Sequence, residues 1–122
     1  MISFKIMNAD GIVIIEPSGR LEQTDFDQLT KGIGAYINEK GYVNGLIIHT
    51  KNFPGWESFR GFIHHMKFIK DHHKKIKKVA AVTDAKFMSI APMVAHHFVS
   101  ADVKHFGYAE MDAAMKWIHE KD

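Results

Sequence analysis

Two short segments of almost wholly apolar residues constrain the fold of this chain more than any other feature. Residues 45–50 read Gly-Leu-Ile-Ile-His-Thr, and residues 79–83 read Val-Ala-Ala-Val-Thr. Strands that are covered on both faces have this composition, because neither face carries polar side chains. A helical pattern separates the two segments, and a helix between two strands of one sheet makes a right-handed crossover. The sequence therefore predicts an α/β domain with a mostly parallel sheet.

Periodicity and turn residues predict the remaining elements. Residues 2–7 and 11–17 are expected to pair as a hairpin, since the turn ends in Asp10-Gly11 and glycine tolerates positive φ. Thr24 provides an N-cap oxygen for a first helix that continues to Gly41. A helix from residue 57, a helix at 89–98, a strand at 102–106 and a terminal helix around Met111 to Ile118 complete the order ββαβαβαβα. We expect one domain over residues 1–122, with a mixed five-stranded sheet, an antiparallel first strand and four helices.

Composition excludes several classes of protein. The chain has 122 residues, of which 46% are hydrophobic and 25% are charged, and these values are typical of globular domains. It has no cysteine, which excludes disulfides, thiolate metal sites and a cysteine nucleophile. The longest aliphatic run is residues 12–15, far shorter than a membrane span, and the first residues do not form a signal peptide. We expect a cytoplasmic protein.

The segment at residues 57–78 is both apolar and strongly basic. Between Arg60 and Lys78 there are seven Lys/Arg residues and one acid, Asp71, although the net charge of the whole chain is only +2. An apolar stripe at helical spacing comprises Phe59, Phe62, Ile63, Met66 and Ile69. Such a helix is expected to cover an apolar cleft, to lie on an anionic surface, or simply to end in solvated lysines.

A ligand site is expected beyond the carboxyl ends of the parallel strands, where loops and helix N-termini converge. The two loops at this edge provide Lys51 and Trp56 after the first central strand, and Asp84, Lys86 and Phe87 after the second. The structural alternative is that both aromatic residues simply pack and that Asp84 caps the next helix.

Metal, nucleic-acid and catalytic sites are weakly indicated. The nine histidines include three adjacent pairs, but neighbouring residues on a helix point about 100° apart, and metal ligands on one face need a spacing of three or four. We expect no metal site and no cofactor. The six lysines between Lys67 and Lys78 permit nonspecific phosphate contact and predict no specific nucleic-acid partner. The chain carries no phosphate-binding glycine loop and no nucleophile elbow, so we expect no enzymatic activity.

Four sequence strings resemble the SpoIIAA-like family, small bacterial domains related to the STAS fold: SGRLEQTDFDQL, GLIIHT, KKVAAVTDAKFM and ADVKHFGYAEMDAAMKWI. This resemblance implies a STAS-like α/β sandwich. STAS anti-sigma-factor antagonists carry an Asp-Ser-Ser/Thr-Gly motif after the central strand, and its serine is phosphorylated. Residues 50–58 hold only Ser58 near that place, without the flanking Asp and Gly. The family also resembles the Sec14-like fold, in which a helix gates an apolar cavity. That resemblance implies that residues 57–72 form a lid, with hinges at Gly55 and Gly61.

Two binding roles follow from these observations. The first is a non-catalytic module that holds a small apolar or amphiphilic, lipid-like ligand under the basic helix and associates peripherally with anionic membrane. Its predicted ligand-binding residues are Lys51, Trp56, Phe59, Phe62, Ile63, Met66, Asp84, Lys86 and Phe87. Its predicted membrane-facing residues are Phe68, Lys67, Lys70, Lys74 and Lys75. The second role is a STAS-type regulatory module that binds a protein partner, with or without phosphorylation of Ser58.

Overall fold

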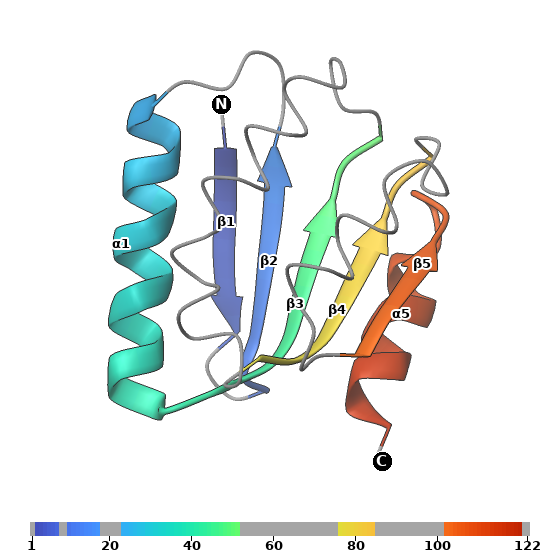
Figure 1. Cartoon of the computed structure of the whole chain (residues 1–122). Helices are drawn as coiled ribbons and strands as arrows, with labels where there is room; N and C mark the ends of the chain where they lie inside the picture. Colours follow the sequence, from blue (N-terminus) through green and yellow to red (C-terminus); the bar gives the residue numbers. More distant parts are fainter. Residues whose placement is uncertain (1, 8–9, 18–22, 52–75, 85–101, 121–122) are drawn as a thin grey trace.

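A computed structural model describes five parts of the chain, residues 2–7, 10–17, 23–51, 76–84 and 102–120. They form a five-stranded sheet in the order β1-β2-β3-β4-β5, with one helix near each end (Figure 1). In chain order the elements are β1 (Ile2–Met7), β2 (Ile12–Pro17), α1 (Gln23–Lys40), β3 (Val43–His49), β4 (Ile76–Val82), β5 (Asp102–Phe106) and α5 (Met111–His119). The predicted mixed five-stranded α/β sheet is therefore confirmed.

The hairpin forms as the turn residues predict. β1 pairs antiparallel with β2, from Ile2 opposite Pro17 to Met7 opposite Ile12. Gly11 has a φ of 68°, a left-handed conformation in which other residues are strained. Its carbonyl accepts the backbone N–H groups of Asn44 at 2.8 Å and Gly45 at 3.3 Å. The turn thus also fixes the start of β3.

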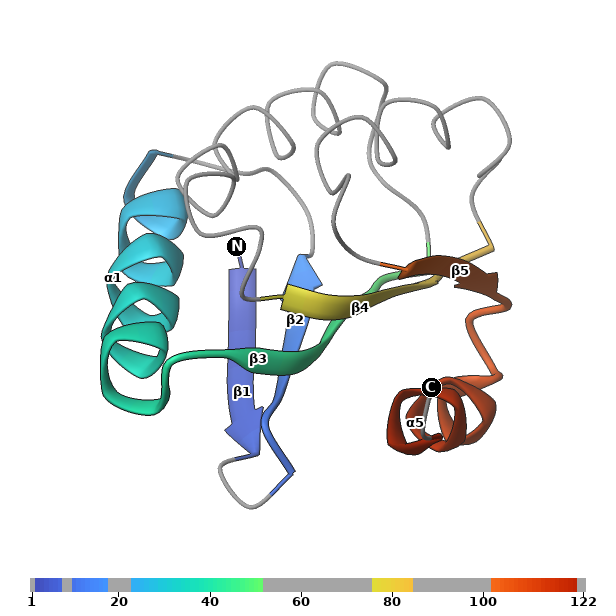
Figure 2. The same ribbon diagram turned by 60° about the horizontal axis from the view of Figure 1, so that its bottom comes forward.

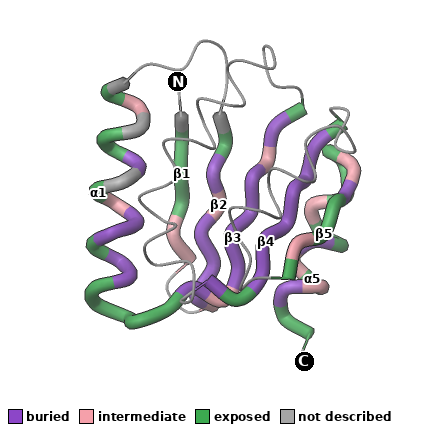
Figure 3. The backbone as a smooth tube through the Cα atoms, viewed as in Figure 1, coloured by how far each residue is buried: buried purple, intermediate pink, exposed green. Residues whose placement is uncertain are grey.

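β3 and β4 form the centre of the sheet, as their apolar composition predicts. They pair in parallel with Leu46 opposite Val79 and Ile48 opposite Ala81, and β2 and β5 pair in parallel on either side of them. Most of their side chains are buried (Figure 3). Side chains alternate between the two faces of a strand, so burial along an uninterrupted run requires cover on both faces.

The two described helices lie on opposite faces of the sheet. α1 lies beside β1, and α5 lies along β3 to β5 (Figure 2). Gly32 of α1 approaches the ring of Phe4, and Ile118 of α5 packs over Gly45. Strand registry places Gly45 opposite Ile12 and Ile12 opposite Met7, so Gly45 and Met7 share one face of the sheet. Phe4 is three residues from Met7 in the same strand and therefore points to the other face, because successive side chains alternate. The helices therefore cover different halves of the core.

Each helix buries one stripe of its surface. On α1 the buried residues include Leu29, Ile33, Tyr36 and Ile37, and the helix stops before Gly41, which has a φ of 85°. This agrees with the predicted end of the first helix. The predicted N-cap was wrong, because α1 begins at Gln23 and Thr24 therefore lies inside the helix. On α5 the buried residues Ala114 and Ile118 join a cluster on the sheet that comprises Ile12, Ile47, Ala80, Val82 and Phe106.

The basic segment ends earlier than the sequence analysis placed it. β4 begins at Ile76 rather than Val79, so Lys77 and Lys78 are strand residues. The expectation that Lys78 belongs to the basic helix was wrong, and the alternative of a solvated lysine does not apply to it, because Lys78 is only 5% exposed. Its Nζ donates hydrogen bonds of 2.9 Å to the carbonyls of Trp117 and Glu120. A cation is favourable there because the C-terminal end of a helix carries partial negative charge.

The other two expected helices, from residue 57 and at 89–98, lie outside the described residues. Among the residues that the structure does describe, no helix is both long and apolar enough to cross a membrane.

Candidate functional site

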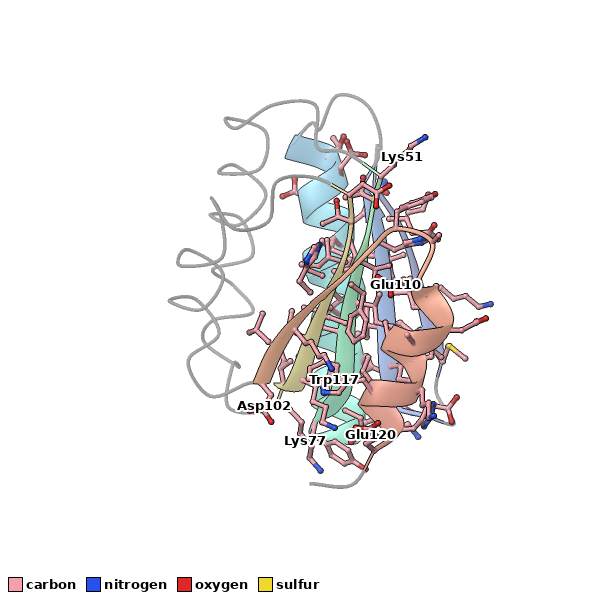
Figure 4. All side chains as sticks on the ribbon, turned by 90° about the vertical axis from the view of Figure 1, so that its right-hand side faces the viewer. Lys51, Lys77, Asp102, Glu110, Trp117 and Glu120 are labelled. Carbon is pink, nitrogen blue, oxygen red and sulfur yellow. The ribbon has the colours of Figure 1, made fainter. Side chains whose placement is uncertain are left out.

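Polar residues gather where β3, β4 and β5 end, at the edge at which the sequence analysis expected a site. The backbone N–H of Asp84 donates to the carbonyl of Lys51 at 3.2 Å, and the Thr83 hydroxyl donates to the same carbonyl at 3.3 Å. The two predicted loops therefore begin side by side. Lys51 and Asp84 are exposed, and Lys51 is labelled at this end of the sheet in Figure 4.

Asp84 connects this edge to the turn between β5 and α5. Its Oδ1 accepts the backbone N–H of Tyr108 at 3.0 Å. The same turn is closed by the Glu110 carboxylate, which accepts the Gly107 N–H at 2.6 Å, and by the Glu110 N–H, which donates to the Gly107 carbonyl at 2.9 Å. This hydrogen bond therefore connects Asp84, which follows β4, to a turn 24 residues later in the chain.

His49 joins three elements at this edge. Its Nδ1 lies 3.4 Å from Glu16 Oε2, and its Nε2 lies 3.3 Å from the carbonyl oxygen of Tyr108. Its ring stacks on that of Tyr108, with centroids 4.5 Å apart and planes inclined by 16°. The end of β2, the end of β3 and the β5–α5 turn are thereby connected through a single imidazole.

This geometry favours a positioning role for His49. Both ring nitrogens face acceptor atoms of the protein itself, and a neutral imidazole has only one N–H to donate. A general base needs a nitrogen within hydrogen-bonding distance of a substrate proton. The arrangement therefore fixes the surface around Tyr108 and directs neither nitrogen toward a substrate.

Sequence reasoning placed Lys51 and Asp84 at this edge but missed Glu16, Tyr108 and Glu110. Tyr108 and Glu110 follow β5, so the rule that sites lie beyond the carboxyl ends of parallel strands would have included them. Glu16 lies near the end of β2 and gives no local signal, because only the pairing of β2 with β3 brings it near His49.

Most predicted site residues lie outside the described residues, and their roles stay predictions. These are Trp56, Phe59, Phe62, Ile63, Met66, Lys86 and Phe87 for the ligand, and Lys67, Phe68, Lys70, Lys74 and Lys75 for the membrane. Within the described ranges, the structure contains no group of three or more His, Cys, Asp or Glu residues that could hold a metal ion.

Comparison with protein families gives a match over most of the chain. The SpoIIAA-like family model matches residues 12–119, which extend from the first residue of β2 to the last of α5. The chain belongs to the SpoIIAA-like family. Comparison with curated proteins gave no match. In this SpoIIAA-like domain the matched range contains all the residues of the carboxyl-end cluster, defined here as Glu16, His49, Lys51, Asp84, Tyr108 and Glu110.

Proposed function

We propose that this SpoIIAA-like domain is a non-catalytic regulatory module that binds a protein partner. The family match over residues 12–119 carries the proposal, because the family is related to STAS domains, whose anti-sigma-factor antagonists act by binding regulatory proteins. The proposal assigns the partner contact to the carboxyl-end cluster.

Three properties of the cluster support this assignment. It is accessible, since Lys51, Asp84 and Glu110 are exposed and Tyr108 is 36% exposed. It is also held in place by the His49 stack and the Asp84 hydrogen bond, so little ordering entropy is lost on binding. Finally, tyrosine is enriched at protein interfaces, where its ring buries a large area and its hydroxyl stays solvated.

Affinity purification from the cell of origin tests the proposal. Wild-type domain is expected to retain a stoichiometric protein partner, detected by quantitative mass spectrometry, and Tyr108→Ala is expected to lose it. Tyr42→Ala is the matched control, because Tyr42 is a tyrosine that is more exposed than Tyr108, at 46%, and that immediately precedes β3, at the other end of the strand from His49. Retention of the same partner by all three proteins, or by none, would contradict the assignment.

The same proposal has a more specific version, in which phosphorylation of Ser58 regulates binding of the partner. Ser58 follows β3 in the sequence and lies outside the described ranges, and a phosphate there would add negative charge to that segment. A Ser58→Ala variant that recovers the partner as the wild type does would remove phosphorylation from the proposal.

The lipid-carrier role remains a separate prediction. Its apolar lining residues lie outside the described ranges, so no described contact favours it over partner binding. Native mass spectrometry of freshly purified protein distinguishes the two roles: a co-purifying lipid mass supports the carrier, whereas a co-purifying protein supports the module. Flotation with anionic vesicles tests the membrane half, and equal, negligible flotation with anionic and neutral lipid would contradict it.

A further inference from the structure

The imidazole of His49 lies between two acceptor atoms of the protein. Its Nδ1 is 3.4 Å from Glu16 Oε2, and its Nε2 is 3.3 Å from the carbonyl oxygen of Tyr108. Neither an ionised carboxylate nor a carbonyl has a proton to donate, so each contact needs an N–H on the ring. The His49 side chain is only 16% exposed, so the protein itself provides most of its polar contacts.

A neutral ring satisfies only one of these two contacts. In either tautomer one ring nitrogen carries the proton and the other presents a lone pair. With the proton on Nδ1, the Nε2 lone pair faces the Tyr108 carbonyl oxygen; with the proton on Nε2, the Nδ1 lone pair faces the Glu16 carboxylate. One contact is therefore repulsive in both tautomers. The imidazolium has two N–H donors and satisfies both contacts.

Glu16 decides which contact the neutral ring keeps. Among the described residues, Glu16 is the charged group that forms an ion pair with His49. Hydrogen bonds to a carboxylate are stronger than those to a neutral carbonyl, so the neutral ring is expected to keep its proton on Nδ1, toward Glu16. The contact that is lost on deprotonation is then the one between Nε2 and the Tyr108 carbonyl.

The other groups around His49 do not replace this contact. The β4 residue opposite His49 is Val82, which is apolar, and the Tyr108 ring stacks on the imidazole. The remaining charged residues of the carboxyl-end cluster are Lys51, Asp84 and Glu110. The two carboxylates accept the backbone N–H groups of Tyr108 and Gly107, and those hydrogen bonds do not depend on the imidazole proton. Deprotonation of His49 should therefore loosen the β5–α5 turn without unfolding it.

We propose that His49 is a proton-dependent clasp for the β5–α5 turn: the protonated ring holds the Tyr108 carbonyl at the end of β3, and the neutral ring releases it. Histidine is the side chain that ordinarily changes charge between about pH 5 and pH 8, so the clasp responds near neutral pH. That this turn contacts a protein partner rests on the proposed function. The clasp itself does not, and it is tested on the protein without a partner.

NMR of the ¹⁵N-labelled protein between about pH 5.5 and pH 8 tests the proposal. Long-range ¹H–¹⁵N correlations of His49 should show both ring nitrogens protonated at the acidic end of its titration and only Nδ1 protonated at the basic end. The amide shifts of Gly107 and Tyr108 should follow the same titration. After correction for the intrinsic exchange rate, protection of the Tyr108 amide should be lower at the basic end by about threefold or more, as expected for loss of one hydrogen bond.

Glu16→Gln separates the clasp from a general effect of pH. The glutamine amide can donate an N–H to Nδ1, so an uncharged ring can carry its proton on Nε2 and still donate to the Tyr108 carbonyl. Protection of the Tyr108 amide in this variant should change by less than about 1.5-fold over the same pH range. Glu39→Gln, which removes an exposed carboxylate of α1, is the matched control and should keep the pH dependence of the wild type.

Four results would each overturn the proposal. The Gly107 and Tyr108 amides might not follow the titration of His49, or the neutral ring might carry its proton on Nε2. Protection of the Tyr108 amide might be equal or greater at the basic end, or Glu16→Gln might retain the pH dependence of the wild type.

Discussion

The side chain of Ile118 fills the space above Gly45: a Cβ built on the glycine would lie 2.5 Å from Ile118 Cγ2 and 2.6 Å from its Cδ1. Gly45 is in a central strand and Ile118 in the last turn of α5, so this contact sets how closely the helix approaches the sheet. A Cβ at position 45 would therefore require the Ile118 side chain to shift from its present position.

Gly45→Ala should therefore destabilise the domain by about 1–3 kcal/mol, the usual cost of overpacking a core. Urea unfolding measures this loss. Ile118→Ala alone should also destabilise the domain, because it leaves a cavity, but the double variant should be more stable than the sum of the two losses predicts. Strictly additive losses would show that the two residues do not compete for the same space.

Lys78→Met should lower the free energy of unfolding by about 2 kcal/mol. The substitution keeps a long apolar side chain but removes the ammonium that donates to the carbonyls of Trp117 and Glu120. Lys77→Met is the control for loss of a lysine from the same strand, and its exposed position predicts a change of less than about 0.5 kcal/mol. Thermal or urea unfolding of both variants checks the difference, and equal effects would contradict the structural role of Lys78.

Asp84→Ala should loosen the β5–α5 turn without unfolding the domain. The variant loses the acceptor of the Tyr108 N–H, so hydrogen exchange at that amide should accelerate by about fivefold or more. Asp84→Asn keeps an Oδ1 acceptor and should retain most of the protection. If the Tyr108 amide of Asp84→Ala exchanges as slowly as that of the wild type, the hydrogen bond to Asp84 is not what protects this amide.

Alkaline pH should destabilise the domain through Tyr36. Burial raises the pKa of Tyr36 above 10.0, and the neighbouring Tyr42 and Glu39 raise it further. Because the folded state keeps this proton to higher pH than the unfolded chain does, the stability contribution is complete below pH 10 and is lost as pH rises toward the folded-state pKa. Tyr36→Phe should lessen the fall in unfolding free energy between about pH 8 and pH 11. An equally steep fall in the unfolding free energies of Tyr36→Phe and the wild type would contradict this role of Tyr36.

Residue patterns in the sequence determined most of the described architecture. The apolar runs at 45–50 and 79–83 predicted the central strands, Asp10-Gly11 predicted the hairpin turn, and Gly41 predicted the end of α1. These signals are local, since an apolar run, a glycine that adopts positive φ and a glycine that ends a helix are each recognised from residues that are close in sequence. The position of Lys51 and Asp84 at the carboxyl edge followed from the same strand assignment.

Tertiary structure alone decided the long-range contacts of Lys78 and His49. In the sequence, Lys78 belongs to a run of lysines that was predicted to be helical. Ile76 and the alternate residues Lys78, Ala80 and Val82 are compatible with one face of a strand. Its burial depends on where the end of α5 lies. The contact of His49 with Tyr108 spans 59 residues, and its contact with Glu16 requires the pairing of β2 with β3. Such contacts depend on strand registry and helix position, and shifting a strand by one residue moves all its side chains to the other face.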